Sequence, residues 1–574
     1  MKKFKLSAML IFMSMLVFSA CGGGGGGSDD PGKPGDPEDP NYTIEIRPAN
    51  GTLYLNCEYE FFAVKENDSK HLDNITWVID DASMAKIDAD GKLTPLKAGK
   101  FKVTGTTAEG EIGMAECTVT SVAVSDVFSL SSGTIIRYKG SGENVAIPAV
   151  INGTAINSIG QNAFDSCNGM ENLEIPSSIT IIEKNAFRGC SSLETINIPS
   201  GVMEIGDSVF ANCVGLKSIE VDLLNSKYKD IDGVLYNKDG TEILCLPVNS
   251  NSNEVYVILP GVTNIGASAF RECGSLKSIQ IPSSVTKIGD DAFNNCKSLE
   301  SIKIPSGVTS IGENAFYYCT SLKSIEIPSG VTSIGGNAFY NCKSLESIII
   351  PSGVTSIGSN AFYKCISLEN IKIPSGVTSI GEYAFNYCTS LKSIELPSSM
   401  ISIGWGAFQA CRSLEAIEIP SGITIINFAL FDNCSSLTGI EIPSLVSFID
   451  VSAFSDCPNL YGIEVDPLNA YYKDIDGVLY NKAGTSLLKV LDKCIVNDAY
   501  VVPSGVTIIE REAFKDCSSL EILRVNALNP PSLESSYLFS GCSKLTKIEV
   551  PSASVAKYKS ADGWKDYTTK IIGF

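Results

Sequence analysis

Histidine is almost absent from this chain of 574 residues, which contains one, His71. Imidazole is the commonest general base and the commonest metal ligand in proteins, so the sequence excludes histidine-dependent triads and histidine-rich metal sites from its repeats. Paired carboxylates can cleave glycosides without histidine, but no acidic pair is set apart from the repeat pattern described below. We therefore expect no enzyme, no catalytic residue, no metal and no cofactor.

Positive charge is also scarce. The sequence has 44 Lys and Arg residues against 64 Asp and Glu residues, which gives a formal net charge of -20 and a pI near 4.7. Partners whose affinity depends on neutralising phosphates, such as nucleic acids, are disfavoured, and so are acidic lipid surfaces. The hydrophobic content of 44% still allows a large core in two or more units.

The apolar run at the start of the chain is too short to span a bilayer comfortably. Lys2, Lys3 and Lys5 precede the apolar residues 6–18, which is typical of a signal peptide, here expected over residues 1–20. The following string Phe18-Ser19-Ala20-Cys21 resembles a bacterial lipobox, and that resemblance implies lipidation of Cys21. The alternative is ordinary secretory cleavage after Ala20, which leaves Cys21 as an unexplained free thiol.

Residues 21–40 contain no segment that can form a core. Six glycines, Ser28-Asp29-Asp30 and a run rich in Pro, Gly and Asp predict a flexible lipidated tether. The acidic part is similar to the signal that displays some lipoproteins on the outer face of Gram-negative anaerobes. The resemblance implies an outer-membrane lipoprotein at the cell surface, with membrane contact through its N-terminal lipid only.

Residues 41–123 show short apolar or alternating segments between Gly, Asp and Asn clusters, which predicts a small β-sandwich. The strings Trp77-Val78-Ile79-Asp80 and Leu96-Lys97-Ala98-Gly99-Lys100-Phe101-Lys102-Val103 resemble the bacterial immunoglobulin-like domain, group 2. Such domains act as spacers or adhesion modules on exported proteins. We interpret Trp77 as a core aromatic between two sheets, with ligand stacking as the alternative. Cys57 and Cys117 are expected to stay unbonded, although sequence cannot establish their distance.

The rest of the chain is built on a period of 23 residues. A Phe stands three residues before each periodic cysteine. The periodic cysteines are Cys167, Cys190, Cys213, Cys273, Cys296, Cys319, Cys342, Cys365, Cys388, Cys411, Cys434, Cys457, Cys517 and Cys542. They contain no Cys-x-x-Cys pair and recur once per rung in an otherwise apolar column, so we interpret them as buried free thiols.

One repeat, residues 322–342, illustrates the predicted rung. A strand that ends at Pro328 is followed by a second short extended piece, a turn permitted by Gly335, and a segment of helical or 3₁₀ spacing. A single rung cannot enclose its apolar groups, but stacked rungs bury them in continuous columns. The inward groups are expected to be Leu322, Ile325, Ile327, Val331, Ile334, Ala338, Phe339 and Cys342.

This repeat closely resembles the BspA-like leucine-rich repeat, with the pattern Leu-x-x-Ile-x-Ile-Pro-x-x-Val-x-x-Ile-Gly-x-x-Ala-Phe-x-x-Cys, from about Ile147 to Pro551. The fold class is therefore mainly β: a small Ig-like β-sandwich followed by a long leucine-rich-repeat solenoid. We expect an N-terminal cap at residues 124–160, repeats at 161–550 and a C-terminal cap at 551–574. Family members are surface or secreted proteins implicated in adhesion.

The period breaks twice in the same way. Cys213 to Cys273 and Cys457 to Cys517 each span 60 residues, and the inserted sequences near 222–258 and 466–501 match. Each predicts a hairpin. A calcium loop starting at Asp230 is the alternative, but it would place residues unsuited to an EF-hand where Gly and Glu are required.

Two surfaces are candidates for binding. Along the strand face, Lys277, Glu300, Lys323 and Glu346 alternate in one column and Lys303, Glu326, Lys372 and Glu395 occupy another, so this face is expected largely to neutralise itself. The residue after each Phe is usually polar and is expected to be exposed, as with Asn294 and Asn386. On three successive rungs this residue is instead a tyrosine. The candidate surface comprises Tyr317, Tyr340, Tyr363, Tyr318, Tyr383, Tyr387 and Trp405.

The sequence therefore predicts a cell-surface lipoprotein that acts as an adhesin or binding scaffold. The resemblance implies an unidentified host matrix protein, bacterial surface protein or glycan as its partner. The alternatives are that the tyrosines merely stack and shield the turns beneath them, and that the protein is a non-catalytic spacer or surface coat without a specific ligand.

Overall fold

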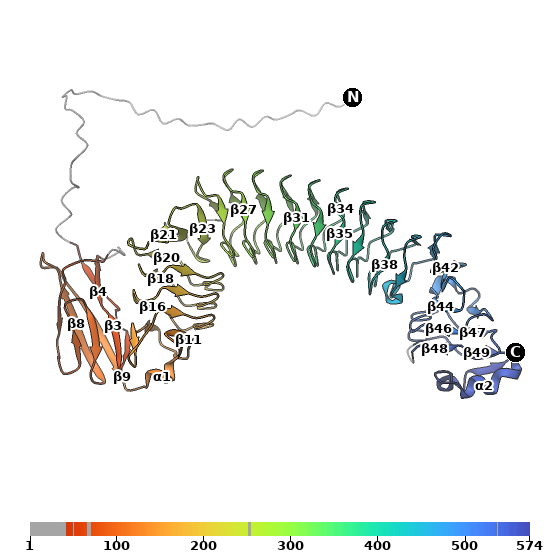
Figure 1. The fold of residues 1–574 in the computed structure, drawn as a ribbon, viewed down its shortest axis with the longest axis horizontal. Helices are drawn as coiled ribbons and strands as arrows, with labels where there is room; N and C mark the ends of the chain where they lie inside the picture. Colours follow the sequence, from red (N-terminus) through yellow and green to blue (C-terminus); the bar gives the residue numbers. More distant parts are fainter. Residues whose placement is uncertain (1–41, 50, 66–70, 251–253, 536–537) are drawn as a thin grey trace, which may run out of the picture. The chain divides into compact units, whose positions relative to one another are not determined.

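The computed structural model describes residues 42–574 except 50, 66–70, 251–253 and 536–537, and the structural statements below concern the described residues (Figure 1). Residues 1–20, the tether at 21–40 and Cys21 lie outside them. Strands account for 32% of the residues and helices for 5%, and about 19 solenoid turns follow an Ig-like region. The predicted fold class is confirmed.

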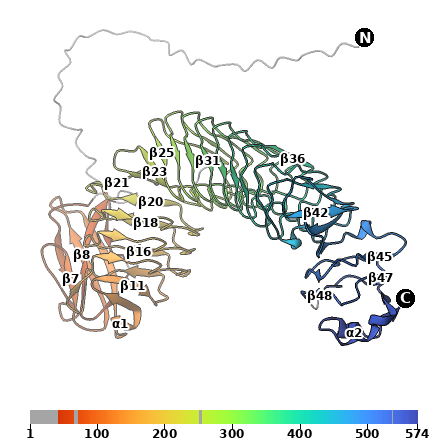
Figure 2. The ribbon, with the colours of Figure 1, turned by 45° about the vertical axis from the view of Figure 1, so that its right-hand side comes forward.

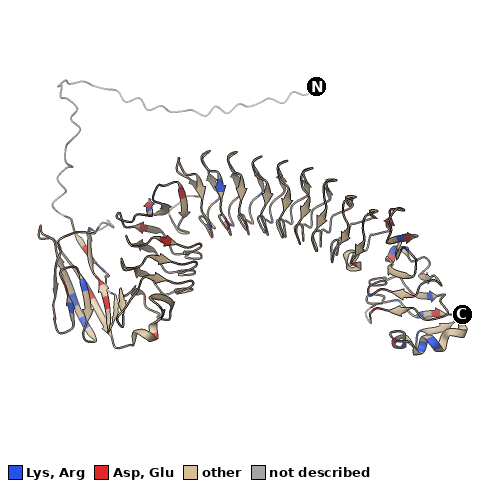
Figure 3. Cartoon of the chain, in the orientation of Figure 1, with Lys and Arg blue, Asp and Glu red and all other residues tan. Residues whose placement is uncertain are grey.

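Antiparallel strands that alternate buried and exposed residues form the Ig-like region. In β9 this alternation is nearly complete, and β9 pairs with β8 over its length. The strands are β1 (Ile44–Arg47), β2 (Thr52–Tyr54), β3 (Cys57–Glu60), β4 (Phe62–Lys65), β5 (Thr76–Ile79), β6 (Ala85–Ile87), β7 (Lys92–Pro95), β8 (Gly99–Thr106) and β9 (Ile112–Thr120). Lys and Glu residues lie on these strands (Figure 3), and Lys102 Nζ is 3.2 Å from Glu116 Oε1.

The interpretation of Trp77 as a core residue needs correction. It lies on β5, an edge strand of its sheet, and its side chain is half-buried. A Cβ on Gly105 would lie 3.0 Å from the Trp77 ring, which shows that the indole covers this glycine. Cys57 and Cys117 are buried free thiols, and burial raises the pKa of each to about 12.

The Ig-like region pairs directly with the beginning of the solenoid. Strand β2 pairs with β12 (Asn144–Ala146), and β3 pairs with β13 (Val150–Ile151), which also pairs with β14 (Thr154–Ala155). Before these come α1 (Val124–Val127), β10 (Phe128–Ser131) and β11 (Thr134–Tyr138), and β11 pairs in parallel with the first short strand of the solenoid. The two parts therefore share continuous sheets.

Nearly every rung contributes one strand to a main parallel ladder, and partners 23 residues apart lie in register, as in Ile302 with Ile325. In the rung of Ala416 the pairing is reduced to a single parallel bridge with Ser393. Figures 1 and 2 show these rungs stacked in sequence order. The main strands are β16 (Asn172–Glu174), β18 (Thr195–Ile198), β20 (Ser218–Val221), β24 (Val255–Val257), β26 (Ser278–Gln280), β28 (Ser301–Lys303), β30 (Ser324–Glu326), β32 (Ser347–Ile349), β34 (Asn370–Lys372), β36 (Ser393–Glu395), β39 (Ile440–Ile442), β41 (Ile463–Val465), β45 (Ala499–Val502), β47 (Ile522–Val525) and β49 (Lys547–Val550).

A second ladder of two-residue strands follows the Pro-Ser-Gly turns and is also parallel. Its members are β15 (Ser158–Ile159), β17 (Ile181–Ile182), β19 (Glu204–Ile205), β25 (Asn264–Ile265), β27 (Lys287–Ile288), β29 (Ser310–Ile311), β31 (Ser333–Ile334), β33 (Ser356–Ile357), β35 (Ser379–Ile380), β37 (Ser402–Ile403), β38 (Ile425–Ile426), β40 (Phe448–Ile449), β46 (Ile508–Ile509) and β48 (Ser532–Leu533).

Between the two ladders lies an apolar core that is continuous from the first insert to the second, and a further cluster follows it. All eight inward groups predicted for residues 322–342 are buried, with exposed fractions of 4% or less. The phenylalanine rings of successive rungs stack, with centroids 5.3 Å apart for Phe293 and Phe316 and 5.4 Å apart for Phe316 and Phe339. Burial of each large side chain contributes roughly 1.5–3 kcal/mol before entropy is counted.

The segment that closes each rung alternates its hydrogen bonds. Tyr340 N donates to Asn337 O and Cys342 N to Phe339 O, the i→i−3 pattern of 3₁₀ spacing. The intervening amides donate to the next rung, as Asn341 N does to Tyr363 O at 2.6 Å. This alternation produces a series of turns, and η1 (Val451–Phe454) is the rung segment assigned as a 3₁₀ helix among the described residues.

The role expected of Gly335 needs correction. Its backbone is not among those with positive φ; the left-handed positions are Asn337 (φ 53°) and Asn341 (φ 60°). A Cβ on Gly335 would lie 3.0 Å from Gly312 O, and on Gly381 one would lie 2.4 Å from Ser359 N. Glycine is therefore required where one rung approaches the backbone of the previous one.

Both inserts form small antiparallel sheets. The first contains β21 (Tyr228–Ile231), β22 (Val234–Asn237) and β23 (Glu242–Cys245), and the second contains β42 (Tyr472–Ile475), β43 (Val478–Asn481) and β44 (Ser486–Lys489). Their third strands, β23 and β44, pair in parallel with β25 and β46 and so rejoin the second ladder. We call these two places the first and second interruptions.

Aromatic residues close the C-terminal end of the core. Trp564 and Tyr558 are fully buried; the indole donates to Pro531 O at 2.7 Å and the phenol to Ala527 O at 2.8 Å. The elements here are η3 (Ser552–Ser554), α2 (Val555–Ser560), η4 (Trp564–Tyr567) and β50 (Ile571–Gly573), while η2 (Asp492–Cys494) follows β44 in the second insert.

Candidate binding surface

Three tyrosines follow the buried phenylalanines on successive rungs and stack on one another. The ring centroids of Tyr317 and Tyr340 are 4.7 Å apart at an interplanar angle of 21°, and those of Tyr340 and Tyr363 are 4.5 Å apart at 12°. The registered rungs bring these side chains together, because equivalent residues on parallel neighbours lie side by side.

Two further tyrosines and a lysine extend this stack. Tyr318 lies 4.7 Å from Tyr317, and Tyr387 meets Tyr363 edge-on at 6.1 Å. Lys364 Nζ lies 5.3 Å from the Tyr363 ring centre and 5.5 Å from that of Tyr387, within the range of a cation–π contact. We call Tyr317, Tyr318, Tyr340, Tyr363, Tyr387 and Lys364 the tyrosine ladder.

The expectation of a uniformly exposed column after each Phe is wrong. Asn294 and Asn386, at this position, are 6% and 3% exposed, and the ladder tyrosines at this position are half-buried. The reason is the close rung spacing, which lets each side chain cover part of the next. Burial, followed by neighbouring tyrosines, raises the pKa of Tyr340 to about 12, so its hydroxyl stays protonated and able to donate at neutral pH.

The backbone of the ladder is unusual. The residue before each cysteine is left-handed, and most such positions carry Asn, Gly or another small or polar residue, whereas Tyr318 and Tyr387 are tyrosines with φ of 59°. Tyr383 occupies the other left-handed position of its rung, with φ of 54°. Bulky side chains are rare in this region because of steric strain, and such strain is concentrated at functional sites. Sequence reasoning missed this feature, although Asn recurring at both positions was a readable signal.

Tyr383 and Trp405 do not belong to the ladder. The Tyr383 ring packs over Gly406, where a Cβ would lie 2.6 Å from it. Trp405 is 52% exposed and belongs to a separate group of exposed apolar side chains on neighbouring rungs. This apolar patch comprises Ile401, Trp405, Ile425, Phe428 and Phe448, of which Ile425 and Phe448 are register partners.

Two buried amides lie in the rungs of the ladder. Asn341 lies between Tyr340 and Cys342 and is 4% exposed. Its Oδ1 has no hydrogen-bond partner among the described residues. Asn386 donates through Nδ2 to Gln409 Oε1 at 2.7 Å, while its own Oδ1 is likewise unpaired there. Unpaired buried carbonyl oxygens are costly and uncommon in folded proteins.

The strand face neutralises itself only in part. Lys277 pairs with Glu254 at 2.6 Å and Lys323 with Glu300 at 3.2 Å, as expected for opposite charges on neighbouring strands. Further along, the second column carries acidic residues on four successive rungs without an ion pair in the described part of the chain. These are Glu395, Glu418, Glu441 and Glu464. The expectation of neutrality is therefore wrong for this half, and part of the excess negative charge lies here.

The periodic cysteines are free thiols, and most of them are buried. Typical members donate to the carbonyl of a phenylalanine in the previous rung, as Cys342 Sγ does to Phe316 O at 3.2 Å. Burial raises the pKa of Cys342. Over the ranges the structure describes, no three His, Cys, Asp or Glu side chains are grouped as a metal site, and each helix there is too short or too polar to cross a bilayer.

Comparison with known proteins follows the same two regions. Six copies described as a BspA type leucine rich repeat region match residues 143–242, 248–368, 355–473 and 490–561, and a bacterial Ig-like domain (group 2) matches residues 55–119. No curated protein matches the chain.

Several solved structures of bacterial leucine-rich repeat proteins are similar. One from Bacteroides ovatus is 27% identical, with 78% of this chain and 97% of that one covered and a TM-score of 0.39. One from Eubacterium ventriosum is 23% identical, with 56% and 97% covered and a TM-score of 0.41. A leucine-rich cell surface protein from Faecalibacterium prausnitzii is 23% identical, with 78% and 96% covered and a TM-score of 0.31.

Proteins with these repeats are cell-surface scaffolds that are generally not enzymes. Because the repeat matches extend over more than half of the sequence, the chain belongs to the BspA-type leucine-rich repeat family, with a group 2 bacterial Ig-like domain before the repeats.

Proposed function

We propose that this protein is a lipid-anchored adhesin or binding scaffold at the bacterial cell surface, and that the tyrosine ladder contacts its ligand. The observation that carries the proposal is the stack of tyrosines on three successive rungs, extended by Tyr318 and Tyr387 in strained left-handed backbone. Tyrosines offer a large, rigid contact area at a low entropy cost, and Lys364 adds a positive charge beside the rings.

A protein or glycan suits this surface better than a small molecule. The ladder is an extended row of half-buried rings and hydroxyl groups, which can stack with sugar rings or pack against a protein while donating hydrogen bonds. Partners in keeping with family membership are a host matrix protein, a bacterial surface protein or a surface glycan. Lipidation at Cys21, export and outer-membrane display belong to the same proposal and rest on the lipobox-like sequence.

A spacer or surface coat is the second candidate. It is favoured by the contacts of the ladder rings with one another, because stacking alone shields the turns beneath them. A spacer has no saturable ligand, which separates the two functions experimentally.

The test is a binding screen of the exported chain against arrays of matrix proteins and glycans, followed by the triple variant Tyr317→Ser, Tyr340→Ser and Tyr363→Ser. We expect saturable binding that the triple variant weakens by about tenfold or more, since aromatic residues dominate the energetics of interfaces. The triple change to Phe keeps the stack and removes the hydroxyls, so it separates stacking from hydrogen bonding.

A matched control lies on the same three rungs: Glu300→Ser, Lys323→Ser and Glu346→Ser on the strand face should leave binding unchanged. Saturable binding that is unchanged by the tyrosine-to-serine substitutions would show that the tyrosine ladder is not the binding site, while the proposed adhesin function would remain supported. Absence of binding to every array member would favour the surface coat.

A further inference from the structure

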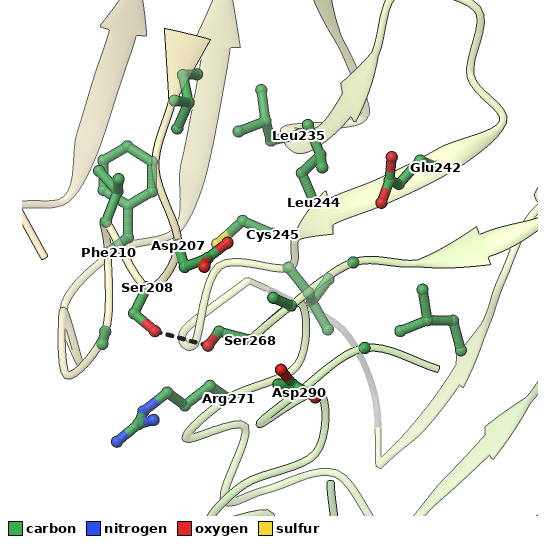
Figure 4. Close-up of a pocket in the computed structure, with 18 of the residues that line it drawn as sticks. Asp207, Ser208, Phe210, Leu235, Glu242, Leu244, Cys245, Ser268, Arg271 and Asp290 are labelled. Atoms are coloured by element: carbon green, nitrogen blue, oxygen red, sulfur yellow. Dashed lines mark hydrogen bonds between the residues drawn. The ribbon is translucent and has the colours of Figure 1, made fainter. Parts of the chain in front are cut away.

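A cavity of about 450 Å³ opens at the first interruption of the solenoid (Figure 4). Strand β19 is the last strand of its parallel sheet, and the ladder resumes with β23 and β25, so the two stretches of solenoid do not pair here through the second ladder. Instead the insert contributes Tyr228, whose hydroxyl accepts from Ile205 N at 3.0 Å. The cavity lies in the gap left between them.

The walls of the cavity expose polar and apolar surface in about equal parts, and acidic residues outnumber basic ones in its lining. Ile205, Phe210, Leu244 and Ile265 belong to the walls, and Figure 4 shows side chains from both sides of the interruption around the space. The acidic lining residues are Asp207, Glu242 and Asp290, and the basic ones are Arg271 and Lys287. The volume is within the range of small-molecule sites.

The carboxylates outnumber the free cations. Arg271 is held by Asp291, which is not part of the lining, at 3.1 Å. Asp207, Glu242 and Asp290 form no ion pair among the described residues, and Lys287 is the one lining cation that is also without an ion pair there. A ligand that enters the cavity therefore meets more unpaired carboxylates than unpaired cations, which favours a positively charged group.

The second interruption provides an internal comparison, because its residues correspond to those of the first at a constant offset in sequence. There, ion pairs and hydrogen bonds join the two sides: Arg511 pairs with Asp450 at 3.4 Å, and Ser455 donates to Glu512 Oε2 at 3.0 Å. The buried Lys489 donates to Glu512 O at 3.2 Å, and a cavity of about 600 Å³ lies beside the pair of Arg511 and Asp450.

At the first interruption the corresponding residues are smaller. Ala267 stands in place of Arg511, Ser268 in place of Glu512 and Cys245 in place of Lys489. The side-chain bridge here is the hydrogen bond between Ser208 and Ser268, 2.6 Å long and visible in Figure 4.

The two acidic residues are likewise specific to the first interruption. Asp207 corresponds to Val451 and Glu242 to Ser486, which carry no charge. Both interruptions therefore leave a cavity. The ion pair of Arg511 with Asp450 crosses the second one, whereas Asp207 and Glu242 at the first form no ion pair among the described residues.

We propose that the cavity at the first interruption binds a small amphiphilic cation, a molecule with an apolar body and an amine. The apolar body lies among Phe210, Leu244 and Ile265, and the ammonium lies at Asp207 and Glu242. This site is separate from the tyrosine ladder and does not depend on the proposed adhesive function.

The test is calorimetric titration of the full chain with three probes that share a phenylethyl group: 2-phenylethylamine, 2-phenylethanol and 3-phenylpropionate. We expect saturable binding of the amine, binding of the alcohol weaker by about tenfold, and no binding of the acid. Saturable binding of the acid at least as tight as that of the amine, or no saturation with any probe, would overturn the proposal.

Two variants locate the site. Ala267→Arg introduces the residue that the second interruption already carries, and it should reduce amine binding by about tenfold or more by filling the mouth and neutralising its charge. The double variant Asp207→Asn with Glu242→Gln should retain alcohol binding and abolish the preference for the amine. If the Ala267→Arg variant does not fold, the double variant still tests the proposal. An unchanged preference of the double variant for the amine over the alcohol would contradict the binding of the ammonium group by Asp207 and Glu242. Arg511→Lys at the second interruption is the control and should bind like the native chain.

Discussion

At the residue scale, the rung depends on a few positions with strict stereochemical demands. Two left-handed residues in most closing segments, Asn337 and Asn341 in one rung, turn the chain so that alternate amides reach the next rung. Gly335 has no Cβ to strike the preceding rung. These demands explain why Asn and Gly recur in the repeat. Tyr318, Tyr383 and Tyr387 are exceptions, because they place bulky side chains in left-handed backbone.

Glu174 provides a test at this scale, because burial raises the pKa of its carboxyl to about 7, with Glu45 and Glu220 adding to the rise and Arg47 opposing it. A raised folded pKa means that the group's stabilisation is complete below its unfolded value near 4.5 and is lost as the pH rises through about 7. We therefore expect Glu174→Gln to raise the urea midpoint of unfolding at pH of about 8 and to change it little at about 4. Equal shifts at both pH values would show that folding does not raise the pKa of this carboxyl.

The residue scale also shows what the sequence could and could not predict. The eight inward groups of the rung were readable from the period alone, because burial of an apolar column leaves a plain signature. The burial of Asn386 and the partial burial of the ladder tyrosines could not be predicted, because they depend on how far each side chain leans over its neighbour. Trp77 was misjudged because a single sequence does not show that β5 lies at a sheet edge.

At the scale of elements, two parallel ladders and a column of stacked phenylalanines hold successive rungs in register. Opposite charges on neighbouring strands further stabilise the register of the rungs where they alternate, as at Glu300 and Lys323. The acidic residues on the main ladder from Glu395 to Glu464 destabilise the stacking of their rungs, since like charges on adjacent strands repel.

Reversal of one charge in this run should therefore stabilise the solenoid. Glu441 faces Glu464 in register, so Glu441→Lys is expected to raise the free energy of unfolding by about 0.5 kcal/mol at low salt, with most of the gain lost at about 1 M salt. The matched control is Glu300→Lys, which places a third positive charge between Lys277 and Lys323 and should destabilise. Urea unfolding at both salt concentrations measures the two changes, and a destabilised Glu441→Lys chain would contradict this account of the strand face.

The sequence predicted the types of secondary-structure element better than it predicted the contacts between them. The 23-residue period predicted the parallel rungs, and the two matching inserts predicted antiparallel strands. The difference between the interruptions escaped prediction, because it arises from side chains such as Ala267 and Arg511 that come close only when the insert rejoins the second ladder.

At the scale of the whole molecule, an Ig-like region and a solenoid share sheets, and the solenoid presents several chemically distinct surfaces on a repetitive framework. The tyrosine ladder, the apolar patch around Trp405 and the acidic run each depart from the repeat within a few rungs. A framework of this kind separates stability, which the inward columns supply, from recognition, which outward substitutions supply.

The measurement that tests the central claim most directly is attachment of intact bacteria to the best ligand from the array screen. Four strains are compared: the native chain, Cys21→Ala, the triple tyrosine-to-serine variant, and the control triple Glu300→Ser, Lys323→Ser and Glu346→Ser. An anchored scaffold that binds through its tyrosine ladder predicts attachment by the native and control strains and its loss in the other two, with the tyrosine variant still present at the surface by protease shaving. Full attachment by the displayed tyrosine variant, or by the strain with Cys21→Ala, would contradict the account.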